Sequence, residues 1–313
     1  MHNKPIVGVV MPVYNGERYL AQTIEAVLGQ TLSDFEFIIV NDGSVDGSRD
    51  VIAQYAKDDR RITVVDQANQ GISRALNGGI ERVSAPYVAP LDQDDISLPN
   101  RFELEVAALD DDPGLVCVSG WYEIIDGQGR YLTTIRQPSD DGEIQRLALA
   151  GHAPVCHSGC MMRRNALVQA GGYDPEFDLA QDLDLYLRLG EIGRLRNIER
   201  PVLRYRVHAG ASSEQRCAEQ RNRARAACER AWARRGIGGE FEASNLYRPD
   251  SSRSSQFKFS LQYGWWAFNS RERQTAIAYG VRAVRMMPFH ADGWRLLACA
   301  VLKPNDVQGR GDG

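Results

Sequence analysis

The chain has 313 residues, of which 43% are hydrophobic and 25% charged, and its formal net charge is −4. This size and balance fit one large α/β domain with an appendage, or two ordinary domains, and argue against a disordered or collagen-like chain. The longest apolar runs, such as 296–302, have about seven residues, far short of the roughly 20 that cross a bilayer. The six cysteines form no disulfide framework, and with no export signal visible we expect free thiols and a cytoplasmic protein.

The charge is unevenly distributed along the chain. Residues 1–213 contain 20 Lys and Arg against 31 Asp and Glu, whereas residues 214–313 contain 17 against 10. The acidic first part argues against a nucleic-acid partner, because phosphate binding needs a basic face. The basic remainder suggests contact with an anionic surface, such as the cytoplasmic leaflet of a membrane.

The first hundred residues alternate short apolar runs with helical patterns, which is typical of parallel strands joined by crossover helices. We expect strands at 6–13, 35–40, 62–65 and 87–91. Helices are expected after Gly16 up to Gly29, at 46–56 and at 73–83.

From residue 100 onward the pattern is mixed. We expect helices starting at 99, 143 and 182, strands at 115–119 and 201–207, and a turn at Asp126-Gly127. Beyond 213 the chain is helical and arginine-rich, with a polar stretch at 245–255 and a last helical segment at 261–302. The expected division is a catalytic domain at 1–213, with a nucleotide-binding half (1–100) and an acceptor half (101–213), followed by a basic helical extension at 214–313.

Polar residues follow three of the predicted strands, where ligands of an open parallel sheet bind. Asp92 and Asp94 lie two residues apart, so in an extended segment they point to the same side and can share a Mg²⁺ or Mn²⁺ ion. The alternative is a solvated acidic turn. Asp42, before Gly43, fits either a binding site or a simple turn. Glycine-rich dinucleotide and P-loop motifs are absent, so a metal is the expected partner of any phosphate groups.

Six ordered motifs in residues 5–213 resemble the inverting family 2 glycosyltransferases with the GT-A fold. They occupy 10–16, 30–47, 70–77, 91–95, 171–189 and 205–212. The resemblance implies a mostly parallel, Rossmann-like sheet flanked by helices, a nucleotide-diphosphate sugar as donor, and a divalent metal. Two positions depart from the family pattern: Gln181 replaces a frequent glutamate, and Leu76 replaces an arginine for which the nearby Arg74 could substitute.

The resemblance also assigns roles to individual residues. Nucleotide binding is implied for Pro12, Val13, Tyr14, Asp42, Arg74, Asn77 and Asp92. Asp94 and His208 are the implied metal ligands, and Asp182 is the implied catalytic base, with a helix N-cap as its alternative. Trp121, His157, Arg163 and Gln181 are implied on the acceptor side, with core packing as the alternative for Trp121.

The sequence therefore predicts a metal-dependent inverting glycosyltransferase that moves a sugar from a UDP- or dTDP-sugar to a hydroxyl of a surface glycan or lipid-linked acceptor. Two alternatives remain: a sugar-phosphate nucleotidyltransferase, which usually needs a glycine-rich basic loop, and a non-catalytic nucleotide-sugar binding module. The aromatic and basic residues after 213 suit either a membrane-interface segment, making the protein peripheral on the inner face of the membrane, or an ordinary helical subdomain.

Overall fold

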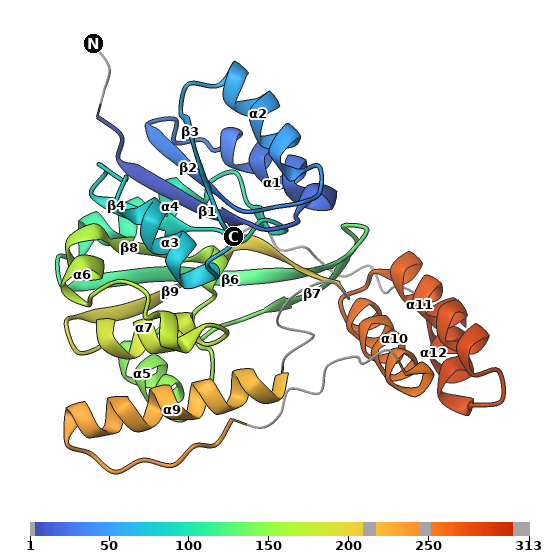
Figure 1. Cartoon of the computed structure of the whole chain (residues 1–313). Helices are drawn as coiled ribbons and strands as arrows, with labels where there is room; N and C mark the ends of the chain where they lie inside the picture. Colours follow the sequence, from blue (N-terminus) through green and yellow to red (C-terminus); the bar gives the residue numbers. More distant parts are fainter. Residues whose placement is uncertain (1–3, 209–216, 244–251, 303–313) are drawn as a thin grey trace. The chain divides into compact units, whose positions relative to one another are not determined.

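The computed structural model describes residues 4–208, 217–243 and 252–302, and its centre is a nine-stranded sheet. The strand order is β3-β2-β1-β4-β8-β6-β9-β5, with β7 paired to β6 (Figure 1). The first four strands pair in parallel: β1 (Val7–Val13), β2 (Phe35–Asp42), β3 (Ile62–Gln67) and β4 (Tyr87–Pro90). The others are β5 (Ile96–Ser97), β6 (Leu115–Asp126), β7 (Tyr131–Ile135), β8 (Met161–Arg163) and β9 (Arg194–Val207).

Each face of the sheet carries its own hydrophobic core, because successive residues of a strand point to opposite faces. Val9 and Met11 of β1 contribute to one core, together with α1 (Glu17–Leu28), α2 (Ser48–Asp58) and α4 (Arg101–Asp111). Val10 contributes to the other core, with α3 (Ile72–Ile80), α5 (Asp141–Leu149), α6 (Arg164–Gln169) and α7 (Gln181–Leu189). All seven residues of β1 are buried, as the continuous apolar run predicted.

The parallel strands confirm the predicted βα alternation and fix where a ligand can bind. From β1 the chain adds β2 and β3 on one side, and then β4 on the other side of β1. Such a reversal of strand order opens a crevice outside the carboxyl ends of the two strands that flank it. The crevice therefore lies between the end of β1, at Val13, and the end of β4, at Pro90.

Helix α9 (Cys217–Arg235) belongs to the same compact unit as most of the sheet. Its small residues Ala227 and Ala231 share a core with Leu183 and Leu187 of α7. The contacts divide the chain into one unit of residues 1–122, 135–206 and 216–245, and a second unit of 123–134, 207–215 and 246–313. This division differs from the predicted boundary at 213, because α9 buries its small-residue face on the first unit.

Most arginines of α9 contact other residues of this first unit. Arg230 pairs with Glu176 at 2.5 Å, and Arg234 and Arg235 pair with Glu191. Arg221 and Arg225 lie over the ring of Phe241. Much of the positive charge expected to face a membrane therefore contacts the chain itself.

The second unit contains α10 (Arg253–Asn269), α11 (Arg273–Met286) and α12 (Ala291–Leu302), with the tip of the β6–β7 hairpin. Tyr279 donates a hydrogen bond to Asp126 at that tip, and Arg130 pairs with the same carboxylate. The last helical segment, predicted to start at 261, begins earlier: α10 starts at Arg253, because the Ser252 side chain caps it by accepting from the Ser255 amide.

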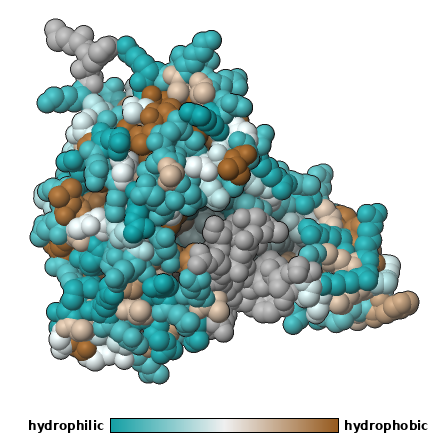
Figure 2. Space-filling view, in the orientation of Figure 1, coloured by the Kyte–Doolittle hydropathy of each residue, from teal (hydrophilic) through white to brown (hydrophobic). Residues whose placement is uncertain are grey.

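The described residues include no helix with both the length and the apolar content needed to cross a bilayer. The face of the molecule in Figure 2 is mostly hydrophilic, with separate hydrophobic spots.

Candidate active site

The loop after β1 is fastened to the loops after β2 and β4, so the three strand ends form one rim. Gln93 accepts a hydrogen bond from the Tyr14 amide at 2.9 Å and donates to the Tyr14 carbonyl at 3.1 Å. Asn15, in the left-handed conformation with φ 52°, accepts from the Val45 amide, and Ser44 accepts from the Asn15 amide. These bonds hold together the ends of β1, β2 and β4, where Tyr14, Asp42 and Asp92 lie.

The first-strand residues contribute to that crevice unequally. Pro12 and Val13 are buried within β1, whereas Tyr14 is 48% exposed. An exposed aromatic ring at a strand end can lie against a nucleotide base. Among these three, Tyr14 is the residue whose side chain is available to a ligand.

Asp42 at the end of β2 is buried and accepts three hydrogen bonds. Its donors are the Gln67 side chain at 2.7 Å, the Gln70 amide at 2.9 Å and the Gly71 amide at 3.0 Å. The carboxylate thereby fixes the loop between β3 and α3. An ionised carboxylate has about four acceptor positions, so one position remains for a further donor.

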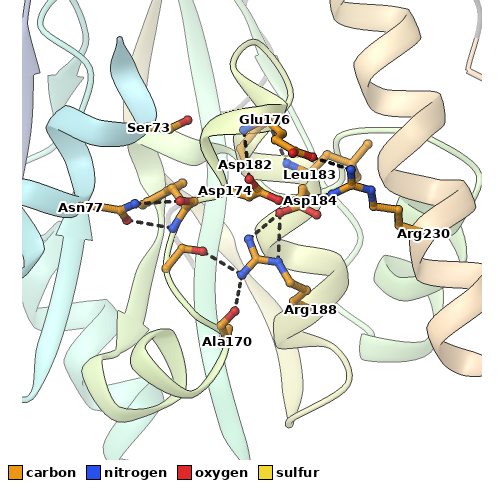
Figure 3. A network of polar contacts seen from close by, with 12 residues as sticks. Ser73, Asn77, Ala170, Asp174, Glu176, Asp182, Leu183, Asp184, Arg188 and Arg230 are labelled. Carbon is orange, nitrogen blue, oxygen red and sulfur yellow. Dashed lines mark hydrogen bonds and ion pairs between the residues drawn. The ribbon is translucent and has the colours of Figure 1, made fainter. Parts of the chain in front are cut away.

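Helix α3 is tied to the segment that precedes α7 (Figure 3). The Asn77 amide donates to the Tyr173 carbonyl at 2.7 Å and accepts from the Tyr173 amide at 2.9 Å. Ser73 donates from its hydroxyl to Asp178 at 2.6 Å. Asn77 therefore positions the backbone, while Arg74 is exposed and bonds only the Gln70 carbonyl among described residues.

The acidic turn after β4 is held by β9. Arg206 donates its amide to Asp95 at 2.9 Å and its guanidinium to the Asp94 carbonyl at 2.8 Å. The second carboxylate oxygen of Asp95 is buried and has no hydrogen-bond partner in the described part of the chain. Burial, followed by the charges of Asp94 and Asp92, raises the pKa of Asp95 well above its usual value.

His157 links this turn to the interior. Its Nδ1 lies 3.7 Å from an Asp92 oxygen, and its Nε2 is 2.9 Å from the Tyr173 hydroxyl. Burial acts to lower the pKa of His157, but the hydrogen bond and charge of Asp92, with smaller effects of Cys160 and Asp182, raise that pKa to about 9. Burial likewise acts to raise the pKa of Asp92, yet His157 keeps it below its usual value. The pair is therefore an imidazolium and a carboxylate at neutral pH.

Asp182 lies in the first turn of α7, within reach of these charges. Burial raises the pKa of its carboxyl group, His157 opposes that rise, and Asp92 adds to it. The N-cap position is Ala180, so the alternative role of Asp182 as an N-cap is wrong. The side-chain oxygen of the neighbouring Gln181 is buried without a hydrogen-bond partner among described residues.

The next acidic residue along α7 has a different environment from Asp182. Asp184 is buried and pairs with Arg188 at 2.5 Å, and Arg188 also donates to the Ala170 and Gly172 carbonyls (Figure 3). The Asp184 carboxylate is therefore structural, whereas that of Asp182 accepts only from the Leu183 amide among the described contacts.

The remaining predicted residues lie in three different settings. Trp121 donates to the Gln137 carbonyl and has Arg136 over its ring. His208 belongs to the second unit. The acceptor-side prediction for Arg163 was wrong: it pairs with Tyr87 at the amino end of β4 and donates to the carbonyls of Leu109, Asp112 and Leu115, far from the carboxyl-end crevice.

The chemistry of the acidic turn fits a divalent cation. Asp92, Asp94 and Asp95 supply only carboxylate oxygens, which are the ligands that Mg²⁺ and Mn²⁺ prefer. The unpartnered, buried oxygen of Asp95 also marks a position where a positive charge would be stabilised. Within the described ranges, no three His, Cys, Asp or Glu side chains are already arranged around one point as a complete metal site.

The sequence did not reveal which residues hold the site residues and their loops in place by hydrogen bonds. These are Gln93, Ser158, Tyr173, Asp178 and Arg206. Gln93, Tyr173 and Arg206 stand inside the recognised motifs, so their positions were a usable signal. Asp178 gave no local signal, because its partner Ser73 is 105 residues away. Ser158 accepts from the Asp92 amide at 3.1 Å across a gap of 66 residues.

Solved structures with similar folds define the class of protein. A mannosyltransferase from Pyrobaculum calidifontis, in complex with GDP-Man and Mn²⁺, matches with a TM-score of 0.55 at 19% identity, covering 96% of this chain and 81% of that one. TarS of S. aureus in complex with UDP matches with a TM-score of 0.51 at 15% identity, covering 93% and 88%. The fold is therefore that of the GT-A glycosyltransferases.

Sequence comparison identifies the family. Residues 8–172 match the model of glycosyl transferase family 2. The EpsE protein of Bacillus subtilis, which carries the name of a glycosyltransferase, is 31% identical over 220 residues, covering 67% of this chain and 76% of that protein. Escherichia coli chondroitin synthase is 28% identical over 196 residues, covering 63% of this chain but only 28% of that protein. The chain belongs to glycosyl transferase family 2.

Proposed function

We propose that the protein is an inverting glycosyltransferase that uses a divalent metal and a UDP- or dTDP-sugar, with Asp182 as the catalytic base. The observation that carries this proposal is the pairing of two carboxylate sites at one crevice. The acidic turn after β4 and Asp182 at the start of α7 both interact with the charge of His157. The acidic turn suits a metal-bound diphosphate, and Asp182 suits the removal of a proton from the acceptor.

Donor recognition is assigned to the rim of the crevice. Tyr14 is exposed beside the strand end, and Asp42 retains an acceptor position that could take the imide N–H of uracil or thymine, a donor that cytosine lacks. Asp94 is the proposed first metal ligand, with Asp92 beside it. Bound there, Mn²⁺ or Mg²⁺ would neutralise charge on the diphosphate leaving group.

Transfer would occur in one displacement. The Asp182 carboxylate accepts the proton of the acceptor hydroxyl while the oxygen of that hydroxyl forms a bond to the anomeric carbon of the donor sugar. The bond from that carbon to the diphosphate breaks on the opposite side, and the electron pair leaves with the nucleotide diphosphate. The configuration at the anomeric carbon is thereby inverted. The raised pKa of Asp182 supports this role, because a carboxylate with a higher pKa is a stronger base.

The acceptor side is proposed at the start of α7, where the buried Gln181 oxygen lacks a partner among described residues, with Trp121 of β6 as a further candidate. We propose a hydroxyl of a surface glycan or lipid-linked intermediate as acceptor. Cytoplasmic location on the inner face of the membrane goes with that proposal.

The test is donor turnover by Asp182→Asn. The amide keeps the shape of the side chain but is no base, so we expect turnover to fall by about 10²- to 10⁴-fold while UDP binding is retained. Asp50→Asn is the matched control, because Asp50 is also a first-turn carboxylate, on α2, but is exposed away from these contacts. Wild-type turnover in Asp182→Asn, or equal losses in both variants, would exclude Asp182 as the base.

A further inference from the structure

The second unit exposes an aromatic side chain on a well-braced turn. We call residues 287–294, which connect α11 to α12, the aromatic turn. Within it, the Phe289 side chain is 102% exposed and Trp294 is 52% exposed. One exposed apolar side chain carries no information by itself. The fixed geometry of this turn and the charges around it indicate that the exposure of Phe289 serves binding.

The backbone of the aromatic turn is held on both sides of Phe289. Trp294 donates its indole N–H to the Pro288 carbonyl at 2.8 Å, and the His290 amide donates to the Met287 carbonyl at 3.1 Å. The His290 ring lies 4.8 Å from the ring of the buried Phe257. The fixed turn therefore holds Phe289 in an exposed position. The backbone of the turn loses little conformational entropy when the Phe289 side chain enters an apolar environment.

The surroundings of the turn are basic. Arg282 and Arg285 on α11 and Arg295 on α12 are exposed, against Asp292 as the acidic residue of the turn. Over residues 252–302 the chain contains seven basic and two acidic residues. Some hydrophobic atoms are also visible at the far end of this helical unit in Figure 2. Aromatic side chains among arginines are typical of segments that lie in the interface of an anionic membrane.

We propose that the aromatic turn inserts Phe289 and Trp294 into the interfacial region of an anionic lipid bilayer, with Arg282, Arg285 and Arg295 at the headgroups. A protein partner fits less well, because a stable interface buries about 1,200–2,000 Å² and needs a larger apolar centre than two side chains. This assignment moves the expected membrane contact from the arginines of α9 to the α11–α12 end. It does not depend on the proposed donor chemistry.

The test is sedimentation of the full chain with vesicles. We expect binding at low salt to phosphatidylcholine vesicles with roughly 30% phosphatidylglycerol, and weak binding to pure phosphatidylcholine. Phe289→Ser should weaken binding about tenfold. Arg282→Gln with Arg285→Gln should weaken it by about fivefold per arginine and reduce its salt sensitivity. The matched control is Val168→Ser, an exposed apolar residue on α6 that is 59% exposed and belongs to the first unit.

Three results would overturn the proposal. They are absence of binding to anionic vesicles at low salt, equal losses for Phe289→Ser and Val168→Ser, and self-association in solution that Phe289→Ser abolishes without any vesicle binding. UDP binding, measured on the same samples, should be unchanged by Phe289→Ser. Failure of the membrane assignment and failure of the proposed enzymatic function are therefore distinguishable.

Discussion

The ion pair between Asp92 and His157 leads to a prediction that can be measured directly. Nδ1 of His157 and a carboxylate oxygen of Asp92 are 3.7 Å apart, and the His157 side chain is 8% exposed. At that distance, with an effective dielectric constant of about 20, the attraction is about 4 kcal/mol. A rise of the pKa of His157 from 6.5 to about 9 corresponds to about 3 kcal/mol, because burial takes part of the attraction back. In Asp92→Asn the raising effect of Asp92 is lost and burial is opposed only by the smaller effects of Cys160 and Asp182, so the pKa of His157 should fall well below 9.

The measurement is a pH titration of the histidine ring signals by NMR. The chain has five histidines, and the signal that disappears in His157→Gln identifies His157. Its midpoint should lie near pH 9 in the wild type and at a clearly lower pH in Asp92→Asn. A wild-type midpoint at or below 6.5, or a midpoint that Asp92→Asn leaves unchanged, would refute the ion pair.

The same pair also predicts how stability depends on pH. The folded pKa of His157 lies above its unfolded value, so its contribution is complete below about pH 6.5 and is lost as the pH rises through about 9. The folded pKa of Asp92 lies below its unfolded value of 3.8, so its contribution is present above that pH and is lost as the pH falls through the folded pKa. The difference in the free energy of unfolding between wild type and Asp92→Asn should therefore be largest between about pH 3.8 and 6.5 and should shrink as the pH rises through about 9.

Three further predictions concern single residues. Asp42→Ala should weaken UDP binding by about 1.5–3 kcal/mol in calorimetry and CDP binding by less, and equal losses would make Asp42 a purely structural residue. Asp94→Ala should abolish the part of UDP affinity that depends on Mn²⁺, and calorimetry with and without Mn²⁺ that shows the same difference in both proteins would place the metal elsewhere. Asn77→Ala leaves two Tyr173 backbone groups unpaired and should lower the free energy of unfolding by about 1–3 kcal/mol in denaturant titrations, whereas an unchanged midpoint would show that these two bonds contribute nothing.

The regular part of the fold could be predicted from the sequence because its signals are local. The run at 6–13 became β1 (Val7–Val13), and the spacing of Leu20, Ile24 and Val27 became the buried face of α1. Continuous apolar runs and helical periodicity each reflect burial of neighbouring residues, so a short window contains the information.

The short strands could not be predicted, because they depend on distant partners. β8 has three residues and pairs Met162 with Val88 on one side and with Cys117 on the other. β5 has two residues and pairs with β9 more than a hundred positions later. Segments of two or three residues have no period of their own, and their conformation comes from the strands beside them. The same reason explains the error at Arg163, whose β8 position at the amino end of β4 follows from that pairing.

Roles within the site were harder to predict than its location, because one residue type serves two purposes. Asp182 and Asp184 are two positions apart in an Asp-Leu-Asp-Leu sequence and are equivalent to any local rule. Only the folded chain separates them: Asp184 is neutralised by Arg188 at 2.5 Å, while the pKa of Asp182 is raised by burial beside the crevice. A carboxylate that already has a full cationic partner gains little from a ligand, whereas one held in a low-dielectric position without such a partner gains much.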